Sequence, residues 1–432
     1  MPTHAELLAR HRRVLPDWMI LYYREPIALV DGDGRYVTDA EGNRYLDFFG
    51  GILVTMSGHR LPRVVEAIKA QADRLLHSST LYLIESQIEL AERIAELSGI
   101  PDAKVFFTNS GTEANDAALM IATQLRNSNQ VIAFRGSYHG RSHSTVAITG
   151  QRAWSATSLS PFHTIYVHGP YKLRSPFGHL SDDEYTAACV RDLEDMLTVG
   201  TAGQVAAMIA EPIQGVGGFA TPPDGFLGAI KEVTDRHDIL FISDEVQTGW
   251  GRTGENFWGY QAHGIVPDLL TFAKGLGNGL AIGGVVASAE VMDSMPANSI
   301  STFGGNPLST AAALANLEYL LENDLQTNAL KVGARLKSGL DDLADEVPEI
   351  AEVRGKGLML GVEFADPESG EPLSGFTGEV MEEAKKAGLL IGKGGLFGNT
   401  LRIAPPLSLT EAEADEGLEK LRTAMLRARS TD

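Results

Sequence analysis

The sequence has very little cysteine, no basic run and no long hydrophobic segment. Cys189 is the single cysteine among 432 residues, which excludes an intrachain disulfide and a thiolate metal cluster. The formal net charge is -20 and no Lys/Arg-rich run stands out, so nucleic acid and anionic membrane surfaces are poor candidate partners. No stretch of about eighteen apolar residues occurs, and the N-terminal "MPTHAELLARHRRVLPDW" lacks the apolar centre of a signal peptide. We therefore expect a soluble, cytoplasmic protein.

What is present is the composition of an ordinary globular protein. Hydrophobic residues make up 44% of the chain and charged residues 21%, and no repeat or low-complexity segment is visible, so disorder is not expected. The length is sufficient for two or three domains. A small anionic substrate fits this acidic chain, because a pocket can be locally positive on an acidic protein.

The hydrophobic pattern predicts an α/β protein. After an N-terminal arm, "ALVDGDGRYVTDAEGNRYLDF" contains three short alternating runs separated by turn signals, which predicts a β-meander. From about residue 61, amphipathic helices alternate with short apolar runs such as "KVFFT", "QVIAF", "ILFISDEV" and "GGVVAS". Strands that are apolar on both faces and alternate with helices predict a mostly parallel, doubly wound sheet.

The pattern changes again around "TFGGNPLSTAAALANLEYLLEN", where long helices begin. The later runs "GLMLGVEF", "GLLIG" and "TLRIAPPL" are typical of a smaller α+β unit. We expect three parts: an arm and β-meander that pack with the small domain (1–60), a large domain (61–310) and a C-terminal small α+β domain (311–432).

Lys274 occupies an unusual position for a cation. It follows the apolar run "DLLTFA", precedes three glycines at alternate positions and has no carboxylate beside it in the sequence. A structural lysine normally lies on a solvated face, because charging a buried ammonium without a partner is costly. Desolvation also lowers the pKa of a lysine, which favours the neutral amine needed to form a Schiff base. This residue alone leaves both interpretations open.

A Ser-Gly-Thr turn follows the predicted strand "KVFFT" and opens a predicted helix. Ser110, Gly111 and Thr112 offer free backbone N–H groups, two hydroxyls and the positive end of a helix dipole. These features are typical of a phosphate site. The alternative is that Ser110 and Thr112 only cap the helix, as many such residues do.

The loop after "QVIAF" holds two histidines and an aromatic residue. Tyr138 and His139 are flanked by glycines, and an aromatic ring there can stack on a flat cofactor. His139 and His143 are four positions apart, a spacing that also suggests zinc. The segment "HGRSH" is loop-like, lacks the glutamate of a helical H-E-x-x-H motif and has no obvious third ligand, so we reject the metal interpretation.

Asp244 is the first polar residue beyond the apolar run "ILFIS". Such a carboxylate can bind a metal, face solvent or pair with a protonated ring nitrogen. Asp244 and Lys274 are thirty positions apart, about one βαβ unit, so both can lie at the strand ends where open α/β sheets bind ligands. An imine-forming amine, an acid for a ring nitrogen, a phosphate turn and an aromatic platform together form the set that pyridoxal 5'-phosphate (PLP) requires.

The motifs that carry this set resemble those of one enzyme family. The segments "NSGTEAND", "SYHGR", "AEPIQGVGG", "DEVQTGWGRTG", "TFAKGLGNG", "STFGGNPL" and "LRIAPPL" are similar to those of the class III aminotransferases, which are PLP enzymes of fold type I. The resemblance covers nearly the whole chain. Within the class, "LDFFGGILVT" and "GLLIGKGGLFGNTLRIAPPL" look most like the alanine–glyoxylate (β-alanine–pyruvate) type.

The resemblance implies a role for individual residues. Lys274 would bind the cofactor covalently and, once released, move a proton, and Asp244 would keep the ring nitrogen protonated. The other cofactor-binding positions would be Ser110, Gly111 and Thr112 at the phosphate, Tyr138 and Val246 on the two ring faces, His139 beside Tyr138, Gln247 at the phenolic oxygen and Glu211 as an orienting residue. Thr302 would reach the phosphate of a neighbouring subunit, which implies a homodimer, possibly paired into a tetramer. Arg402 would bind the substrate α-carboxylate.

Two places depart from the expected pattern or stay open. The family often has "GHCHP" early in the chain, whereas this sequence has "GHRLP", which leaves the entrance there in doubt. Arg141, in "YHGR", matches the arginine that binds the distal carboxylate in the 4-aminobutyrate type. The alternative is a solvated loop arginine, because the alanine–glyoxylate type does not require that residue.

The resemblance implies a ping-pong transamination from an amino acid or ω-amine donor to pyruvate, glyoxylate or 2-oxoglutarate. A PLP-dependent decarboxylase, racemase or aminomutase would carry nearly the same residues. A nucleotide-binding oxidoreductase is disfavoured, because no clean G-x-G-x-x-G lies between a strand and a helix with an acidic residue about twenty positions on. A non-catalytic binding protein is disfavoured by the presence of both Lys274 and Asp244.

Overall fold

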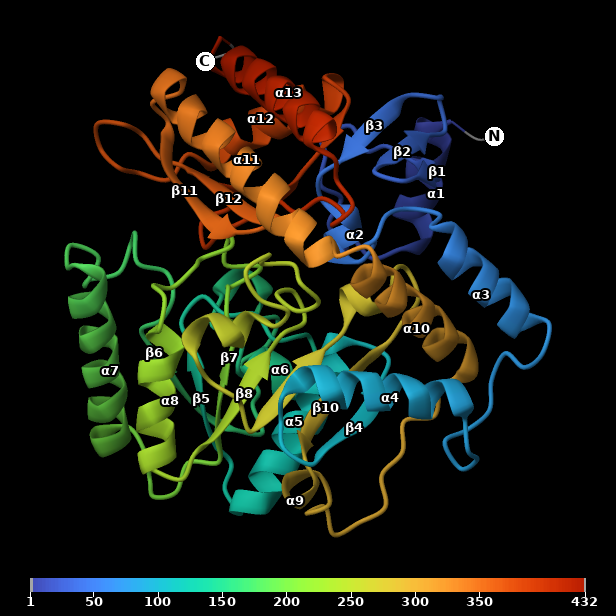
Figure 1. The fold of residues 1–432 in the computed structure, drawn as a ribbon. Coiled ribbons are helices and arrows are strands. Elements are labelled where there is room, and N and C mark those ends of the chain that lie inside the picture. Colours follow the sequence, from blue (N-terminus) through green and yellow to red (C-terminus); the bar gives the residue numbers. More distant parts are fainter. Residues whose placement is uncertain (1–2, 431–432) are drawn as a thin grey trace.

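The computed structural model describes residues 3–430, which form three β-sheets and their surrounding helices (Figure 1). The largest sheet occupies the lower part of Figure 1, and the two four-stranded sheets lie above it. The N-terminal and C-terminal segments both lie in this upper part.

The large sheet has seven strands in the spatial order β4, β10, β9, β8, β7, β5, β6. The β5–β6, β5–β7, β7–β8 and β8–β9 pairs are parallel, and only β10 is antiparallel to its two neighbours. This arrangement confirms the predicted, mostly parallel sheet. The strand bounds are β4 (Ala103–Thr108), β5 (Gln130–Phe134), β6 (His163–Val167), β7 (Ala207–Ala210), β8 (Leu240–Asp244), β9 (Leu269–Phe272) and β10 (Gly283–Ser288).

Both faces of this sheet are covered by helices. In β5, Val131 and Ala133 pack into the cluster that contains helix α5 (Gly111–Arg126). The alternate residues Ile132 and Phe134 pack into a second cluster with helices α7 (Asp182–Val199) and α8 (Phe226–Arg236). Successive side chains of a strand point to opposite faces, so burial of both sets explains the continuous apolar runs and confirms the doubly wound arrangement.

A third group of helices covers the β4–β10 end of the sheet. Helix α10 (Pro307–Glu322) packs against α3 (Pro62–Ala72) and α4 (Glu85–Ser98). Proline at the first turn favours the start of α3 and of α10, and Gly99 ends α4 in the left-handed conformation. The shorter helices are α6 (His143–Ala147), η1 (Arg152–Trp154), η2 (Gly259–His263), η3 (Lys274–Gly277) and α9 (Ala289–Met292).

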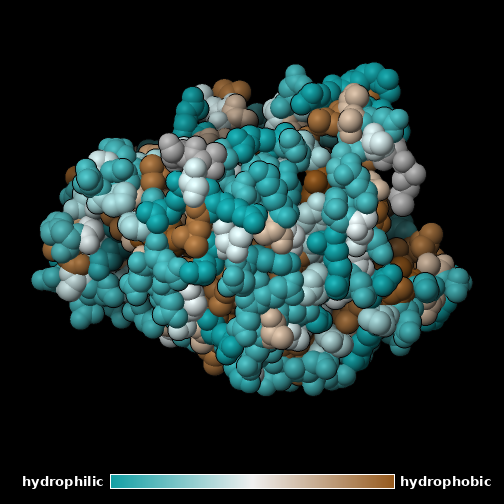
Figure 2. Space-filling view, turned by 90° about the horizontal axis from the view of Figure 1, so that it is seen from above, coloured by the Kyte–Doolittle hydropathy of each residue, from teal (hydrophilic) through white to brown (hydrophobic). Residues whose placement is uncertain are grey.

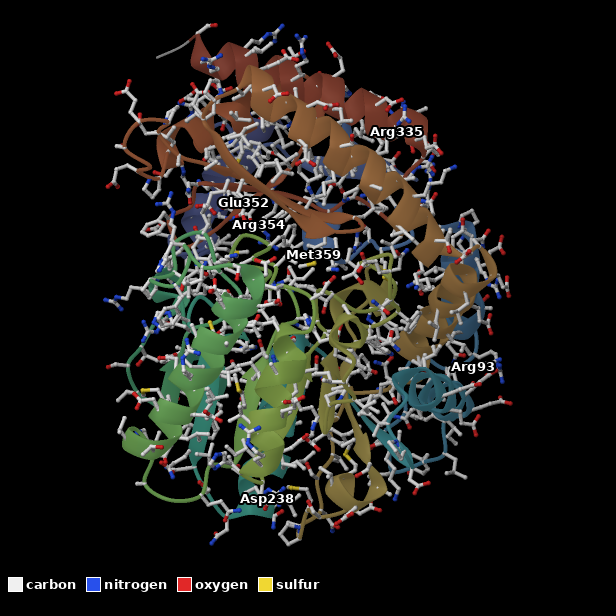
Figure 3. All side chains as sticks on the ribbon, turned by 60° about the vertical axis from the view of Figure 1, so that its left-hand side comes forward. Arg93, Asp238, Arg335, Glu352, Arg354 and Met359 are labelled. Carbon is white, nitrogen blue, oxygen red and sulfur yellow. The ribbon has the colours of Figure 1, made fainter. Side chains whose placement is uncertain are left out.

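The C-terminal unit is an antiparallel sheet with helices. Its strands are β11 (Ile350–Lys356), β12 (Met359–Phe364), β15 (Thr400–Ile403) and β14 (Gly392–Gly394), in that order. The helices are α11 (Leu325–Glu346), α12 (Ser374–Lys386) and α13 (Glu411–Arg429). Figure 3 shows Glu352, Arg354 and Met359 where this unit meets the large-sheet part. There Arg354 Nε donates a 2.9 Å hydrogen bond to the carbonyl of Gly218.

The predicted β-meander is present near the N-terminus. After helix α1 (His4–Val14), the antiparallel strands β1 (Leu29–Asp33), β2 (Tyr36–Asp39) and β3 (Arg44–Asp47) follow one another. Strand β3 also pairs with β13 (Leu389–Leu390) from the C-terminal part, so the two ends of the chain share one sheet. The one-turn segment α2 (Gly50–Leu53) then leads toward the large sheet.

We keep the three-part division into residues 1–60, 61–310 and 311–432 as a proposal. Residue 310 lies inside the continuous helix α10, which packs on α3 and α4 of the large-sheet part. The outer ends of the first and third parts, at residues 1–2 and 431–432, lie outside the described residues.

The surface seen from above is mainly hydrophilic, with hydrophobic residues in separate patches (Figure 2). Within residues 3–430, no helix combines the length and apolar character that crossing a bilayer requires.

Candidate functional site

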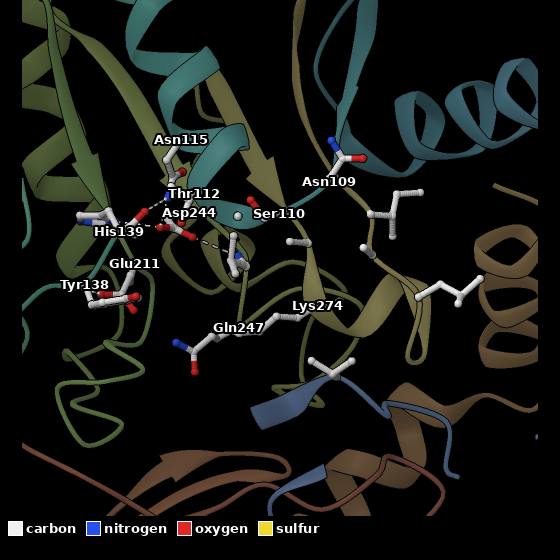
Figure 4. Close-up of a pocket in the computed structure, with 18 of the residues that line it drawn as sticks. Asn109, Ser110, Thr112, Asn115, Tyr138, His139, Glu211, Asp244, Gln247 and Lys274 are labelled. Carbon is white, nitrogen blue, oxygen red and sulfur yellow. Dashed lines mark hydrogen bonds and ion pairs between the residues drawn. The ribbon is translucent and has the colours of Figure 1, made fainter. Parts of the chain in front are cut away.

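A cavity of about 360 Å³ lies at the carboxyl ends of the parallel strands. The residues after β4, β5, β7, β8 and β9 all contribute to its wall, because parallel strands end at the same edge of a sheet. Figure 4 shows these side chains around the cavity, with Asn115 and His139 beside Asp244. The predicted site residues that line it are Ser110, Gly111, Thr112, Tyr138, His139, Glu211, Asp244, Val246, Gln247 and Lys274.

Lys274 lies at the first position of η3, directly beyond strand β9. Its backbone has a left-handed φ of 43°, a conformation that costs energy for a residue other than glycine and is found at functional sites. Part of the side chain is accessible from the cavity, and Lys274 forms no ion pair with a carboxylate within residues 3–430. Burial of the amine, with a smaller contribution from Arg402, lowers the pKa of Lys274 to about 8.

Asp244 ends strand β8 and is buried. Its Oδ2 accepts hydrogen bonds from His139 Nδ1 and Asn115 Nδ2, each at 2.8 Å, and its Oδ1 accepts one from the backbone N–H of Val246 at 3.1 Å. These three donors compensate a buried negative charge, which would be costly without them. His139 is buried in this contact, whereas His143 is exposed at the start of α6.

Ser110 is the N-cap of helix α5, because its hydroxyl accepts a 3.2 Å hydrogen bond from the backbone N–H of Glu113. The capping interpretation is therefore correct for Ser110. The N–H groups of Gly111 and Thr112 are at the first two helical positions and have no acceptor within the helix. Capping and anion binding are thus compatible at this turn.

The turn approaches the next wall of the cavity very closely. A methyl group added at Gly111 would lie 2.9 Å from Val246 Cγ2, so glycine is required to bring this turn beside Val246. Residues 109–116, which supply this part of the cavity wall, contain no lysine or arginine. An anion bound there would be held by backbone N–H groups and hydroxyls.

Glu211 lies beyond strand β7 with its carboxyl group fully surrounded by protein. It accepts hydrogen bonds from the backbone N–H groups of Tyr138 at 2.9 Å and Gly215 at 2.8 Å. Burial raises the pKa of Glu211 to about 7. Glu211 therefore fixes the loop that carries Tyr138, whose ring packs edge-on against Trp154 at 5.7 Å.

Arg402 reaches the site from strand β15 of the C-terminal sheet. It is only 2% exposed, and its guanidinium lies 5.1 Å from the ring centre of Phe49 and 4.9 Å from that of Phe219. Its Nη2 donates a 3.0 Å hydrogen bond to Oε1 of Gln247, while its Nε has no partner among the described residues. Arg402 is thus a buried cation bonded to a side chain of the cavity wall, and it forms no ion pair with any carboxylate in residues 3–430.

The remaining two predicted residues lie apart from the cavity wall. Thr302 is exposed on the loop before α10. Arg141 is also exposed, and its guanidinium lies 5.3 Å from the ring centre of Trp18 on the N-terminal arm. A single chain therefore does not bring Thr302 or Arg141 into contact with the other site residues.

Asn115 is a site residue that sequence reasoning missed. It lies on the buried face of α5 with Ala118, Leu119 and Ala122, at the helical spacing of three, four and seven positions. A polar amide within such an apolar stripe was the available signal, because a buried polar side chain requires hydrogen-bond partners. Val54 also lines the cavity and carried no comparable signal.

The arrangement fits PLP on its own chemistry. The cavity combines an amine that is about half neutral near pH 8, a buried carboxylate with spare acceptor capacity and a helix N-terminus with free N–H groups. These groups match an aldehyde, a protonated ring nitrogen and a phosphate, respectively. Within the described residues, no group of three His, Cys, Asp or Glu side chains suits a metal ion.

Comparisons with known proteins agree with this chemistry. Residues 22–425 match the family described as Aminotransferase class-III. The chain is 42% identical over 429 residues to the mitochondrial alanine–glyoxylate aminotransferase 2 homolog 2 of Arabidopsis thaliana, covering 98% of this chain and 88% of that protein. It is 41% identical over 395 residues to the acetylornithine aminotransferase of Mycolicibacterium smegmatis, covering 91% of this chain and 92% of that protein.

A solved structure shows the same likeness in three dimensions. The PLP-bound amine transaminase from an uncultivated Pseudomonas species superposes with a TM-score of 0.88 at 32% identity, covering 93% of this chain and 95% of that one. The fold is therefore that of the fold-type I PLP enzymes. The chain belongs to the class III aminotransferases, enzymes that use pyridoxal 5'-phosphate to move an amino group from a donor to an oxo acid.

Proposed function

We propose that this aminotransferase exchanges an amino group between a small amino acid such as alanine and a small 2-oxo acid such as glyoxylate or pyruvate. The observation that carries the proposal is Arg402, a buried cation with a neutral hydrogen-bond partner, beside the cavity that contains Lys274. The relative of 42% identity whose name includes alanine and glyoxylate supports the same substrate class.

Ten residues would hold the cofactor, which when bound supplies an aldehyde that accepts nitrogen and a ring that withdraws electrons. Ser110, Gly111 and Thr112 would bind the phosphate through N–H groups and hydroxyls, and Asp244 would accept a hydrogen bond from the protonated ring nitrogen. The remaining contacts in the proposal are Tyr138 and Val246 on the ring faces, His139 beside Tyr138, Gln247 at the phenolic oxygen, Glu211 as the anchor of the Tyr138 loop and Lys274 as the covalent attachment point.

Lys274 would also move the proton in the reaction. With a pKa of about 8, about a tenth of the amine is neutral at pH 7 and about half at pH 8, so its Nζ can accept a proton from the substrate carbon and return it. The left-handed backbone at Lys274 fixes where the side chain leaves the end of β9. We infer that this residue is the base and acid of the proton transfer.

Arg402 would hold the substrate carboxylate. Its guanidinium lies against two aromatic rings and is bound to Gln247, so its position is set before substrate arrives. A carboxylate that binds there gains charge-assisted hydrogen bonds from a buried guanidinium, 2% exposed. Fixing the carboxylate and the cofactor together selects which bond at the substrate carbon is broken.

A second candidate is a longer ω-amino donor with 2-oxoglutarate as acceptor. The name of the Mycolicibacterium smegmatis relative, acetylornithine aminotransferase, supports this class. The observation that favours it is Arg141, a cation three positions after Tyr138 that is held near Trp18 and is available for a distal carboxylate. A solvated Arg141 favours the first proposal instead.

We also propose that the active unit is a homodimer with shared sites. Ile88 and Ile300 are exposed and line the groove between β4 and α4. The segment between α3 and α4 and the loop before α10 expose further large apolar side chains, and these two segments meet where His77 contacts Phe303, with ring centres 5.0 Å apart. The exposed side chains there are Leu75, Leu76, Leu81, Tyr82, Leu83 and Phe303. Monomers rarely expose so many large apolar groups in one region. Thr302 lies on this surface between Ile300 and Phe303. The adjacent Ser301 accepts a hydrogen bond from Asn109, the residue before the phosphate turn. A second copy packed on this surface would therefore place its phosphate turn near the Thr302 of the first copy. Sedimentation should give twice the chain mass of 46.4 kDa, or a further doubling for a tetramer.

A substrate screen tests the substrate proposal. Alanine, β-alanine, N-acetylornithine and 4-aminobutyrate would each be combined with glyoxylate, pyruvate and 2-oxoglutarate, except alanine with pyruvate, which gives no net reaction. The product amino acids would be quantified. We expect the highest kcat/KM for alanine when glyoxylate is the acceptor, and for the other donors when pyruvate is the acceptor. Preference for acetylornithine with 2-oxoglutarate would replace the first proposal by the second. Release of CO2 without nitrogen transfer would contradict both.

The cytoplasmic location stays a proposal that cell fractionation tests, since the Arabidopsis relative is mitochondrial.

A further inference from the structure

Asn115 lies directly behind the carboxylate that is proposed to face the cofactor ring. Its side chain projects from α5 toward the end of β8 and contacts Asp244 and His139 (Figure 4). Asn115 is 1% exposed and Thr271, on the neighbouring strand β9, is fully buried. Asn115, Asp244 and Thr271 belong to helix α5 and to strands β8 and β9, and only His139 in this set comes from a loop.

The amide of Asn115 has only one favourable orientation. Its Nδ2 donates to Asp244 Oδ2 and to the carbonyl of His139, both at 2.8 Å. Its Oδ1 accepts a 2.7 Å hydrogen bond from the hydroxyl of Thr271. A rotated amide would place Oδ1 against a carboxylate and a carbonyl, which are both acceptors. Thr271 and His139 therefore fix Asn115 as a donor toward Asp244.

This orientation divides the two oxygens of Asp244 into different roles. Oδ2 accepts two hydrogen bonds, from Asn115 and His139, and both of its lone pairs are used. Oδ1 accepts one, from the N–H of Val246, and keeps one lone pair. Asp244 itself lines the cavity. The remaining acceptor capacity of the carboxylate is thus concentrated on Oδ1.

We propose that Asn115 is a positioning residue that holds Asp244 with Oδ1 available to the protonated ring nitrogen of PLP. Asn115 itself touches neither cofactor nor substrate in this proposal. It acts by fixing the rotation of the Asp244 carboxylate and by compensating its charge, together with His139. The inference rests on the proposed role of Asp244.

The chemistry predicts an unusual order of substitutions. Asn115→Ala removes a donor from Asp244, and hydrogen bonds to charged groups are worth enough for a loss of about 10- to 100-fold in PLP affinity. Asn115→Asp has nearly the same shape but places a second carboxylate against Asp244, so its affinity for PLP should be lower still. If Asn115 only filled space, the opposite order would be expected. Asn115→Asp, which nearly keeps the shape of the side chain, would then bind PLP more tightly than Asn115→Ala.

The experiment measures PLP binding to the apo-protein by titration of intrinsic fluorescence, together with the pH dependence of the absorbance of the bound cofactor. We expect the affinity order wild type, Thr271→Val, Asn115→Ala, Asn115→Asp, from tightest to weakest. We also expect the absorbance midpoint to move in both Asn115 variants. Asn399→Ala removes another fully buried amide, on the C-terminal unit, and should keep the wild-type affinity and midpoint.

Asp244→Asn, measured in parallel, separates this inference from the proposed role of Asp244. If Asp244→Asn binds PLP as tightly as the wild type and keeps its absorbance midpoint, the role of Asp244 is wrong. If Asp244→Asn is impaired but Asn115→Ala equals the wild type, or Asn115→Asp binds PLP better than Asn115→Ala, the positioning role of Asn115 is overturned. Should Asn115→Asp fail to fold, equal affinities of Asn115→Ala, Thr271→Val and wild type would overturn it as well.

Discussion

The two arginines that the resemblance assigns to substrate lie in very different surroundings. Arg402 is buried between Phe49 and Phe219 and bonded to Gln247. Arg141 is exposed on a loop, and its guanidinium lies 5.3 Å from the ring centre of Trp18, which is itself 69% exposed. One chain therefore holds the first arginine in place and leaves the second one solvated.

The difference shows which parts of the site a single chain completes. Lys274, Asp244 and Arg402 lie on strands or directly after them, where packing fixes backbone and side chain together. Arg141 and Thr302 are exposed, so the packing of one chain does not fix their side chains. Burying a charge costs free energy, but a buried charge in a fixed position binds an oppositely charged ligand strongly. We expect substitutions to divide along the same line.

The largest effect should follow removal of the buried amine. Lys274→Ala should lower kcat by at least about 10³-fold, because both the covalent attachment and the proton carrier are lost. Steady-state assays with alanine and glyoxylate measure this. Lys337→Ala, which removes an exposed lysine paired with Asp341 on α11, is the matched control and should be unchanged. Activity in Lys274→Ala near the wild-type level would show that Lys274 is not the reactive amine.

Removal of the buried arginine should have the next largest effect. Arg402→Ala should raise KM for alanine and pyruvate about 100-fold, since charge-assisted contacts in a buried site are worth several kcal/mol. An amine without a carboxylate, such as 1-phenylethylamine, should keep its kcat/KM within about threefold of the wild type. Arg335→Ala, at an exposed ion pair with Asp415, is the control. Equal losses for amines with and without a carboxylate would refute the assignment.

The pH dependence of cofactor binding sharpens the description of the buried amine. Because the neutral amine attacks the aldehyde and the pKa of Lys274 is about 8, the rate constant for PLP binding to apo-protein should rise about tenfold per pH unit below pH 8 and level off above it. Stopped-flow absorbance measures this. A free lysine derivative, with the ordinary pKa of 10.5, is the control. A midpoint near pH 10 in the protein would show that the amine is solvated.

The same shift has a consequence for stability. The pKa of Lys274 in the folded protein is below the ordinary value of 10.5, so the unfolded chain binds more protons between about pH 8 and pH 10.5. The contribution of Lys274 to the free energy of unfolding of the apo-protein therefore rises with pH across that window. Denaturant titrations of wild type and Lys274→Met should differ in this slope, with the wild type the steeper.

The smallest effect should come from the exposed arginine. Arg141→Ala should change kcat/KM for alanine by less than about fivefold, the range of exposed charge interactions. The comparison with N-acetylornithine and 2-oxoglutarate is decisive for the alternative. A loss confined to those substrates would assign Arg141 to a distal carboxylate, whereas equal values for all substrates would support a solvated arginine.

The features of the fold and the site that the sequence predicted best are those that depend on residues adjacent in the chain. The apolar run before Asp244, the glycines after Lys274 and the turn that begins at Ser110 are local patterns, and the strands and the helix start lie where these patterns indicate. Arg402 was reached only through the resemblance, because it comes from another sheet and no local pattern links it to Lys274. Asn115 was missed, since its role depends on the carbonyl of His139 and the carboxylate of Asp244, which are 24 and 129 positions away in the chain.

The most direct test is to locate the bond between the protein and its cofactor. Holoenzyme reduced with borohydride and digested should yield one peptide that carries a pyridoxyl group, and fragmentation should place that group on the Nζ of Lys274. Lys274→Arg treated in the same way should yield no labelled peptide. A pyridoxyl group on any other side chain, or no label in protein that is fully loaded with PLP, would contradict the account.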